Sequence, residues 1–345
     1  MRQVSEDLTA PGGAPTLDEV ARLAGVSRAT ASRAINGGHR VSPRALTAVE
    51  DAVRTLGYRP NPAARSLVTR RTDSVALVVP EPDERVFADP FFGHTLRSVN
   101  RVLDERDLQL VLLLARPGEE GRLLRYLSRR NIDGALVVSH HRHDRLAEHL
   151  SGLGLPAVFV GRPWAAVRTL SWVDTDNVAG GRLAAQRLLD GGRRRLATIA
   201  GPADMAAGAD RLAGWCEVVE GAGLSASAVR RGDFTESGGL AAGRALLAEH
   251  PDLDGLFAAS DLMAAGALRA LAEAGRSVPG DVAVVGYDDL EVAERTSPTL
   301  TTVRNPVGEM VERATRLLLD QLADVGEREA EQVVFPPALV SRDSA

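Results

Sequence analysis

A chain of 345 residues exceeds what one ordinary hydrophobic core holds, so its length predicts a small domain joined to a larger, two-lobed one. Apolar residues make up 44% of the chain and charged residues 25%, which excludes a disordered or fibrous protein. The net charge of −5 is unevenly spread, because residues 1–72 hold eleven arginines and six acidic residues, a net charge of +5, which leaves −10 for the rest. A basic head on an acidic body predicts that the head binds a polyanion; the alternative is chance clustering of charge on solvated helices.

The single cysteine, Cys216, cannot form an intrachain disulfide or a thiolate metal cage, which favours a reducing compartment. The first residues lack the apolar segment of a secretory signal, and no apolar run approaches the ~20 residues of a membrane span. We therefore expect a cytoplasmic protein without a membrane role.

Two segments predict a helix, a tight turn and a second helix. Thr16 and Glu19 form a capping-box pattern that starts the first helix. Gly25 permits a positive φ, and Ser27 can cap a second helix over Arg28–Ile35. We expect Ala31, Ala34 and Ile35 of this second helix to face inward.

A third helix completes the predicted head, which covers residues 16–57. It begins at Ser42-Pro43, because proline suits the first helical position, and it ends at Gly57. Its expected apolar face consists of Leu46, Val49, Val53 and Leu56.

Two irregular segments flank the head. Residues 1–15 are rich in Pro, Gly and Ala without apolar periodicity, which predicts a disordered tail. In residues 58–72 two prolines stop the preceding helix, and Asn61 with Pro62 can begin a short new one. We interpret this second segment as a hinge.

The body, residues 73–345, alternates short β-branched runs with helical stretches, and a similar series starts again at about Asn177. This pattern predicts two α/β lobes, each a doubly wound parallel sheet, with ligands gathering beyond the carboxyl ends of the strands. The expected strands are 74–79, 108–114, 135–138, 157–160, 169–173, 196–200, 255–258, 282–285 and 300–303.

Four stretches together resemble the LacI/GalR, or lactose-repressor, family of bacterial transcription regulators. They are the segment TLDEVARLAGVSRATASRAING with the later LGYRPNPAARSL, the segment DPFF at 89–92, the segment DTDN at 174–177, and PGDVAVVGYDDLEVAERTSPTLTTV at 279–303. A helix-turn-helix alone would be a weak signal, but these motifs occur in the family's order from Thr16 to about Arg342. The resemblance implies a repressor with lobes of the periplasmic-binding-protein type, whose affinity for double-stranded operator DNA is controlled by a small effector, a sugar or sugar derivative.

The resemblance places the second helix in the major groove and assigns five of its residues to DNA: Arg28, Ala29, Thr30, Ser32 and Arg33. Their chemistry fits, because Arg can donate twice to guanine, Thr and Ala methyl groups can touch thymine, and Ser can bond a base or a phosphate. The alternative is that the two arginines are merely exposed on an amphipathic helix.

Three further residues are assigned to DNA through contacts other than base reading in the major groove. Asn36 and Tyr58 resemble phosphate contacts, which fix the register of the protein on the duplex. Leu67 matches the hinge leucine that wedges between bases from the minor-groove side in the family. The alternative for Leu67 is a linker residue that packs on its own domain. Such wedges act in pairs, so we expect a homodimer on a pseudo-palindromic operator.

The resemblance also implies an effector site in the body, with Arg211 as a donor and Asp288 as an acceptor for sugar hydroxyls. Aromatic side chains would cover the apolar face of the ring, unless they are ordinary core residues. The complete set of candidates is Phe91, Phe92, Trp172, Arg211, Phe234, Ser260 and Asp288.

The sequence departs from the family at three positions, of which Ser260 is one of these effector-site candidates. Ser260 replaces an Asn found in many members, Asp89 replaces the usual Asn before Pro-Phe-Phe, and Gly161 stands where the lactose repressor has a carboxylate. The resemblance therefore names no particular sugar.

Rival functions find little support in the sequence. A periplasmic sugar-binding protein would need an export signal, and motifs of nucleotide-dependent enzymes, serine hydrolases and zinc proteases are missing. His140, His141, His143 and Asp144 form a metal-like cluster that we interpret as a solvated loop. We expect no catalytic residues, no metal and no cofactor. Leucine heptads are missing near Arg342, which argues against a tetramerising coiled coil.

Overall fold

The structure, a computed structural model, describes residues 15–35, 41–59, 71–116, 118–129, 131–164, 170–323 and 329–345. The chain divides between Thr72 and Asp73 into two compact units, here called the head and the body. None of the described helices is long and apolar enough to cross a membrane.

The head contains three helices: α1 (Leu17–Leu23), α2 (Arg28–Ile35) and α3 (Pro43–Leu56). The capping box at Thr16 forms as expected, because its backbone N–H donates to the Glu19 carboxylate at 2.7 Å and its side chain accepts from the Glu19 N–H. Gly25 makes the turn with φ +65°, and Gly57 ends α3 in the left-handed conformation. The sequence therefore predicted the three helices of the head nearly to the residue.

The core of the head differs from the expected one at α3. Val49 is fully buried as expected, but Leu46 is 39% exposed and Ala52 is buried in its place. Leu46 belongs to the first turn of α3, three residues after Pro43, whereas Val49 and Ala52 lie against α1 and α2. Ala31 of α2 is buried in the same cluster.

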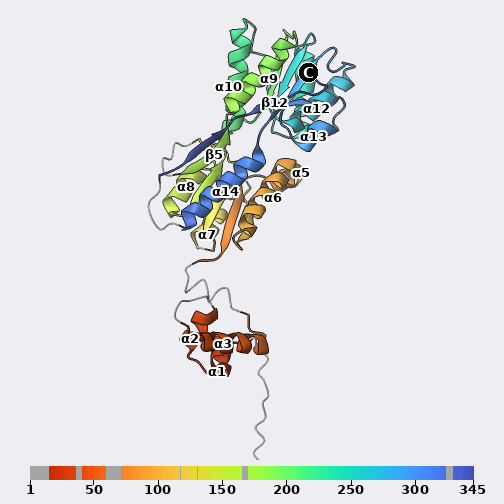
Figure 1. The fold of residues 1–345 in the computed structure, drawn as a ribbon. Helices are drawn as coiled ribbons and strands as arrows, with labels where there is room; N and C mark the ends of the chain where they lie inside the picture. The colour runs from red at the N-terminus through yellow and green to blue at the C-terminus, as the bar shows by residue number, and fades with distance from the viewer. Residues whose placement is uncertain are drawn as a thin grey trace, which may run out of the picture. The chain divides into compact units, whose positions relative to one another are not determined.

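Figure 1 shows that the body consists of two lobes, each built on a six-stranded sheet. The lobe 1 sheet has the order β11-β5-β4-β3-β1-β2, with parallel pairing throughout, and its strands are β1 (Ser74–Val79), β2 (Gln109–Leu114), β3 (Gly134–Val138), β4 (Ala157–Val160), β5 (Ser171–Thr175) and β11 (Gln332–Phe335). The lobe 2 sheet has the order β12-β10-β9-β8-β6-β7, and its strands are β6 (Leu196–Ala200), β7 (Val229–Arg231), β8 (Gly255–Ala258), β9 (Ala283–Asp288), β10 (Thr301–Arg304) and β12 (Ala338–Val340).

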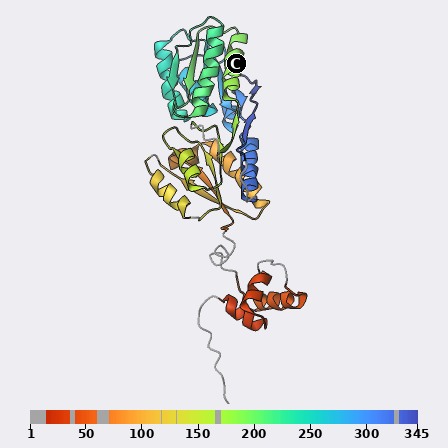
Figure 2. The ribbon, with the colours of Figure 1, turned by 90° about the vertical axis from the view of Figure 1, so that its left-hand side faces the viewer.

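Helices cover both faces of each sheet, as in a doubly wound fold (Figure 2). The lobe 1 helices are α5 (Asp83–Ala88), α6 (Pro90–Asp104), α7 (Glu120–Ser128), α8 (Leu146–Leu153) and α14 (Val307–Ala323). The lobe 2 helices are α9 (Asn177–Asp190), α10 (Ala206–Gly221), α11 (Glu236–Glu249), α12 (Asp261–Glu273) and α13 (Glu291–Arg295). The strand β1 shows why both faces must be covered, because Val75, Leu77 and Val79 enter one apolar cluster and Ala76 and Val78 the other.

The chain passes between the lobes three times, from β5 to α9, from β10 to α14 and from β11 to β12. Three short strands, β7, β11 and β12, were not expected, and β12 pairs antiparallel with β10. They have three or four residues each and no fully buried side chain, so they lack the apolar run that marks the other strands.

Glycines allow the helices α9 and α10 to pack unusually closely. A Cβ atom at Gly181 would overlap the carbonyl oxygen of Arg211, and one at Gly214 would overlap the carbonyl oxygen of Val178. Because Arg211 lies in this contact, the glycines also set how near its side chain comes to the start of α9.

We predict that Gly214→Ala lowers the free energy of unfolding by about 1–3 kcal/mol, since the added methyl group meets backbone and not a movable side chain. Gly221→Ala is the matched control, because the same helix leaves open space there and alanine is the better helix former. Urea denaturation followed by circular dichroism compares the two, and equal midpoints would contradict the close packing.

Candidate functional site

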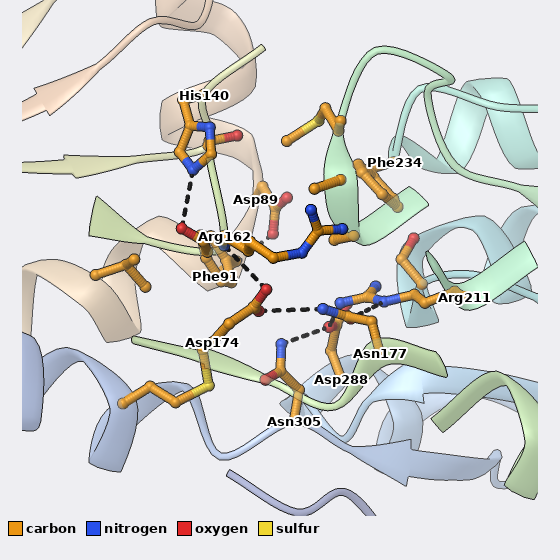
Figure 3. Close-up of a pocket in the computed structure, with 18 of the residues that line it drawn as sticks. Asp89, Phe91, His140, Arg162, Asp174, Asn177, Arg211, Phe234, Asp288 and Asn305 are labelled. Carbon is orange, nitrogen blue, oxygen red and sulfur yellow. Dashed lines mark hydrogen bonds and ion pairs between the residues drawn. The ribbon is translucent and has the colours of Figure 1, made fainter. Parts of the chain in front are cut away.

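A cavity of about 810 Å³, counted with its open mouth, lies between the two lobes beyond the carboxyl ends of their strands (Figure 3). This is the place where parallel α/β sheets bind ligands. Its polar lining residues are Arg85, Asp89, Ser139, His140, Arg162, Asp174, Asn177, Arg211, Ser260, Asp288 and Asn305.

Arg211 on α10 is the most enclosed cation of the lining, with 5% of its surface exposed. Its Nε donates to Asn177 Oδ1 at 2.8 Å, and one terminal nitrogen donates to the Ala259 carbonyl at 2.7 Å. The guanidinium carbon lies 3.6 Å from the ring centroid of Tyr287, over its face. A buried arginine held on three sides presents its remaining N–H groups in one fixed direction.

Asp288, the last residue of β9, is the acceptor that faces Arg211. Its Oδ1 lies 3.4 Å from a terminal nitrogen of Arg211 and accepts a hydrogen bond from the Asn305 side chain at 3.2 Å. Burial raises the pKa of Asp288, and the charge of Arg211 opposes that rise. The pair therefore offers adjacent donor and acceptor groups, as hydroxyl recognition requires.

Asp174 and Asn177 stand at the first crossing between the lobes. Asp174 Oδ1 accepts from the Asn177 side chain at 3.1 Å, and its Oδ2 accepts from the backbone N–H of Arg162 at 2.9 Å. Burial raises the pKa of Asp174, while the hydrogen bonds from the backbone N–H groups of Arg162 and Thr175 lower it. Through Asn177, the crossing is hydrogen-bonded to Arg211.

Asp89 lies on the lobe 1 side of the cavity, where it caps α6 by accepting from the Phe91 N–H at 2.9 Å. Burial raises the pKa of Asp89 to about 6; the Phe91 hydrogen bond opposes the rise, and the charge of Asp288 adds to it.

The structure brings five of the seven expected effector residues to the cavity and leaves two outside its described lining. Phe91, Arg211, Phe234, Ser260 and Asp288 line it. Phe92 is 1% exposed because its ring points into the lobe 1 core, edge-on to Phe91. Trp172 on β5 packs against the apolar cluster on the other face of the lobe 1 sheet.

Ser260 and Phe234 reach the cavity by local geometry. Ser260 caps α12, since its side chain accepts from the Met263 N–H at 3.2 Å. Phe234 adopts φ +65°, and its ring centroid lies 5.8 Å from the Arg211 guanidinium and 5.6 Å from that of Arg85. The aromatic ring thus closes one side of the cavity between two arginines.

The expectation of a solvated loop at His140 to Asp144 holds for His143, which is exposed, but is wrong for His140 and Asp144, which are buried. His140 is 7% exposed, its Nε2 lies 3.1 Å from the Gly161 carbonyl oxygen, and burial lowers its pKa to about 4. His141 lies between Glu81 and Asp204, and Asp144 is also buried. Asp204 of lobe 2 contacts the loop at His141, whereas His140 is enclosed by Gly161 and Phe159 of its own lobe. Among the described residues, no group of three or more His, Cys, Asp or Glu side chains could hold a metal ion.

The helix α2 presents most of its expected DNA-reading residues at the surface of the head. Arg28, Ala29 and Arg33 are exposed, whereas Thr30 and Ser32 are half-buried. Arg28 Nε lies 3.4 Å from an Asp18 carboxylate oxygen in an exposed pair, which is a weak interaction that a phosphate or a base can replace.

The structure describes only one of the other three residues that were assigned to DNA. Tyr58 is half-buried against the core of the head. Asn36 and Leu67 lie outside the described residues, so their assignments stay predictions.

Known families match both units of the chain. Residues 16–61 match the model of bacterial regulatory proteins of the lacI family, and residues 185–345 match a periplasmic binding protein-like domain. The transcriptional regulator CelR of Thermobifida fusca is 49% identical over 96% of this chain and 98% of its own length. The chain belongs to the LacI family. It is a helix-turn-helix transcription regulator, and the fold class expected from the sequence is confirmed.

Other relatives agree with this assignment. The ribose operon repressor of Escherichia coli K12 is 34% identical over 96% of this chain and 99% of its own. Among solved structures, a complex of the regulator CelR with cellobiose has a TM-score of 0.77 at 46% identity, covering 96% of this chain and 100% of that one. A lac repressor dimer bound to operator and an anti-inducer has a TM-score of 0.84 at 25% identity, covering 96% and 99%.

Several lining residues of this LacI-family protein were not predicted as site residues. Arg162, Asp174, Asn177 and Asn305 come from the ends of strands or from the crossings, and His140 comes from the misinterpreted loop. A signal existed for two of them, because Asp174 and Asn177 belong to the DTDN motif that was recognised without being assigned a role.

We predict that Asp89→Asn raises the free energy of unfolding near pH 7 by about 1–3 kcal/mol. A carboxyl whose pKa is raised from 3.8 to about 6 destabilises the fold progressively as pH rises through that window, whereas the amide keeps the α6 cap without a charge. Denaturation at pH 4 and pH 7 measures the difference. A stability gain that is the same at both pH values would contradict the assigned pKa.

Proposed function

We propose that this regulator is a cytoplasmic homodimeric repressor that releases its operator when a neutral disaccharide of the cellobiose type binds between the lobes of the body. The observation that carries the proposal is the donor–acceptor pair of Arg211 and Asp288 in a cavity flanked by Phe234 and Phe91. The body binds the sugar without converting it.

The chemistry of the cavity supports a polyhydroxylated ligand. Arg211 supplies fixed N–H donors, and Asp288 has one carboxylate oxygen engaged, so that donors and acceptors alternate over a short distance. The rings of Phe91 and Phe234 offer apolar surface of the kind that covers the face of a pyranose. Hydroxyl pairs and an apolar ring face are the two features that sugars present together.

The relatives support the cellobiose type over other sugars. A solved CelR is described as a cellobiose complex, and that protein is 46% identical over its whole length, whereas the ribose operon repressor is 34% identical.

The head supports operator reading through α2. We propose that Arg28 and Arg33 read base edges, with Ala29, Thr30 and Ser32 beside them, and that Asn36 and Tyr58 contact phosphates. Leu67 serves as the minor-groove wedge, which needs a second copy of the chain at the centre of the operator. The lac repressor structure that this chain resembles is a dimer on its operator.

We predict that Arg211→Ala abolishes sugar control while the protein still binds its operator, because the substitution removes a contact in the body and leaves the head intact. The affinity for cellobiose should fall at least 100-fold, since the change also strips Asp288 of its cationic partner inside a buried site. Calorimetry measures the cellobiose affinity, and titration on a duplex selected by the protein from random sequences measures operator release.

Arg182→Ala provides the matched control for this experiment. Arg182 of α9 pairs with Glu217 of α10 on the surface of the same helix pair, with about half of each side chain exposed. The Arg182→Ala protein should bind cellobiose with the affinity of the wild type. An Arg211→Ala protein that binds cellobiose normally would remove Arg211 from the site, and a wild type that binds no sugar would refute the proposed effector class.

A further inference from the structure

Asp204 is the residue of lobe 2 on which a group of contacts from lobe 1 converges. It lies in the loop between β6 and α10. Its carbonyl oxygen accepts from the Arg142 backbone N–H at 2.8 Å and from the Trp164 indole N–H at 2.5 Å. Its carboxylate lies 2.9 Å from His141 Nδ1. One residue of lobe 2 is therefore held by three groups of lobe 1.

His141 has a second carboxylate on its other side. Its Nε2 lies 3.0 Å from Glu81 Oε1, and Glu81, which is 3% exposed, also accepts from Ser139 at 2.7 Å and from Arg85 at 2.6 Å. An imidazole with a carboxylate at each nitrogen donates twice, which only its protonated form can do. His141 is thus a cation that joins an anchored carboxylate of lobe 1 to a carboxylate of lobe 2.

The position of Asp204 connects this contact to the cavity. The helix α10 begins two residues later, and its Ala206, Ala207 and Arg211 line the cavity from the lobe 2 side. Glu81, which holds His141, also accepts a hydrogen bond from Arg85, and Arg85 lines the cavity from the lobe 1 side. Fixing Asp204 on lobe 1 therefore fixes the distance between the two sides that a ligand must contact.

We propose that His141 and Asp204 form a clasp across the lobes that positions α10, and with it Arg211, for the effector. This rests on the proposed function for the identity of the effector only. The described lining of the cavity includes neither His141 nor Asp204, so the clasp acts through the lobe arrangement and not through sugar contact. Both are positioning residues.

The charged groups around His141 favour its protonated form. Burial opposes the charge, but the hydrogen bonds and charges of Glu81 and Asp204 outweigh it and raise the pKa of His141 to about 9. Asp144 accepts from the His141 backbone N–H. Arg142 lies on the same loop as His141, and its guanidinium carbon is 5.3 Å from the ring centroid of Trp164. The clasp is therefore fully formed at neutral pH and weakens as pH rises through about 9.

The clasp has a consequence for affinity. If only the clasped arrangement binds the effector well, the apparent dissociation constant rises in proportion as that arrangement becomes rarer. Losing one charge-assisted hydrogen bond across the lobes should then weaken effector binding about tenfold. Operator release should need a correspondingly higher effector concentration.

Hydrogen exchange of the Arg142 amide tests the clasp in the full-length protein without any sugar. This amide donates across the lobes, so it exchanges when the clasp opens. Exchange should be faster in His141→Gln and in Asp204→Asn than in the wild type. Glu217→Gln, which breaks an exposed ion pair within lobe 2, is the control and should leave it unchanged. Unchanged exchange in both clasp variants would overturn the proposal.

Calorimetry with cellobiose completes the test. The two clasp variants should each bind about tenfold more weakly, and the double variant should be no weaker than either single one, because both changes remove the same interaction. The affinity of the wild type for cellobiose should fall between pH 8 and pH 10, as His141 loses its proton. The chain contains no lysine that could titrate in this window. The affinity of His141→Gln for cellobiose should not change over the same pH range.

The outcomes separate the two proposals. Wild-type affinity for cellobiose in both clasp variants, or additive losses in the double variant, would overturn the clasp. Failure of the wild-type protein to bind any sugar would refute the proposed function, and the exchange of the Arg142 amide would still decide whether the clasp exists.

Discussion

The burial of the Arg211 guanidinium is the constraint on which the body depends. A cation that is 95% buried is costly unless every donor is directed at an acceptor, and here the acceptors come from separate parts of the chain. Asn177 starts the first crossing between the lobes, Ala259 follows β8, and Asp288 ends β9. Satisfying one side chain therefore ties the first crossing to the centre of the lobe 2 sheet.

The packing around Arg211 serves the same constraint. Gly181 and Gly214 let α9 and α10 approach until the arginine reaches Asn177, and Tyr287 supplies a ring face for the guanidinium plane. The remaining N–H groups and the free side of Asp288 then face the cavity. A ligand that bonds both would bind a site whose geometry is already set, which reduces the ordering cost of binding.

Much of this could be predicted from the sequence, because local signals are strong where an element is uniformly apolar or clearly capped. The run SVALVV is buried on both faces and was predicted to the residue, as was α2 with Ser27 at its start. The polar short strand VRR at Val229–Arg231 has no such signal. The resemblance to the family supplied Arg211 and Asp288, which composition alone could not.

The errors share a physical cause, namely that burial by a distant segment leaves no local pattern. His141 looked solvated because Asp204, which binds it, lies 63 residues further along the chain, and His140 looked solvated because its partner Gly161 lies 21 residues further. Phe91 and Phe92 are neighbours on one helix, about 100° apart, so only one can face the cavity, and the sequence does not say which.

The central claim is that sugar bound in the body and DNA bound by the head are coupled, and thermodynamic reciprocity tests it most directly. Cellobiose affinity should be measured for the free protein and for the protein saturated with its selected operator duplex. We predict that the operator weakens cellobiose binding by the same factor, between about 5 and 150, by which cellobiose weakens operator binding. Equal cellobiose affinity with and without operator would contradict the account.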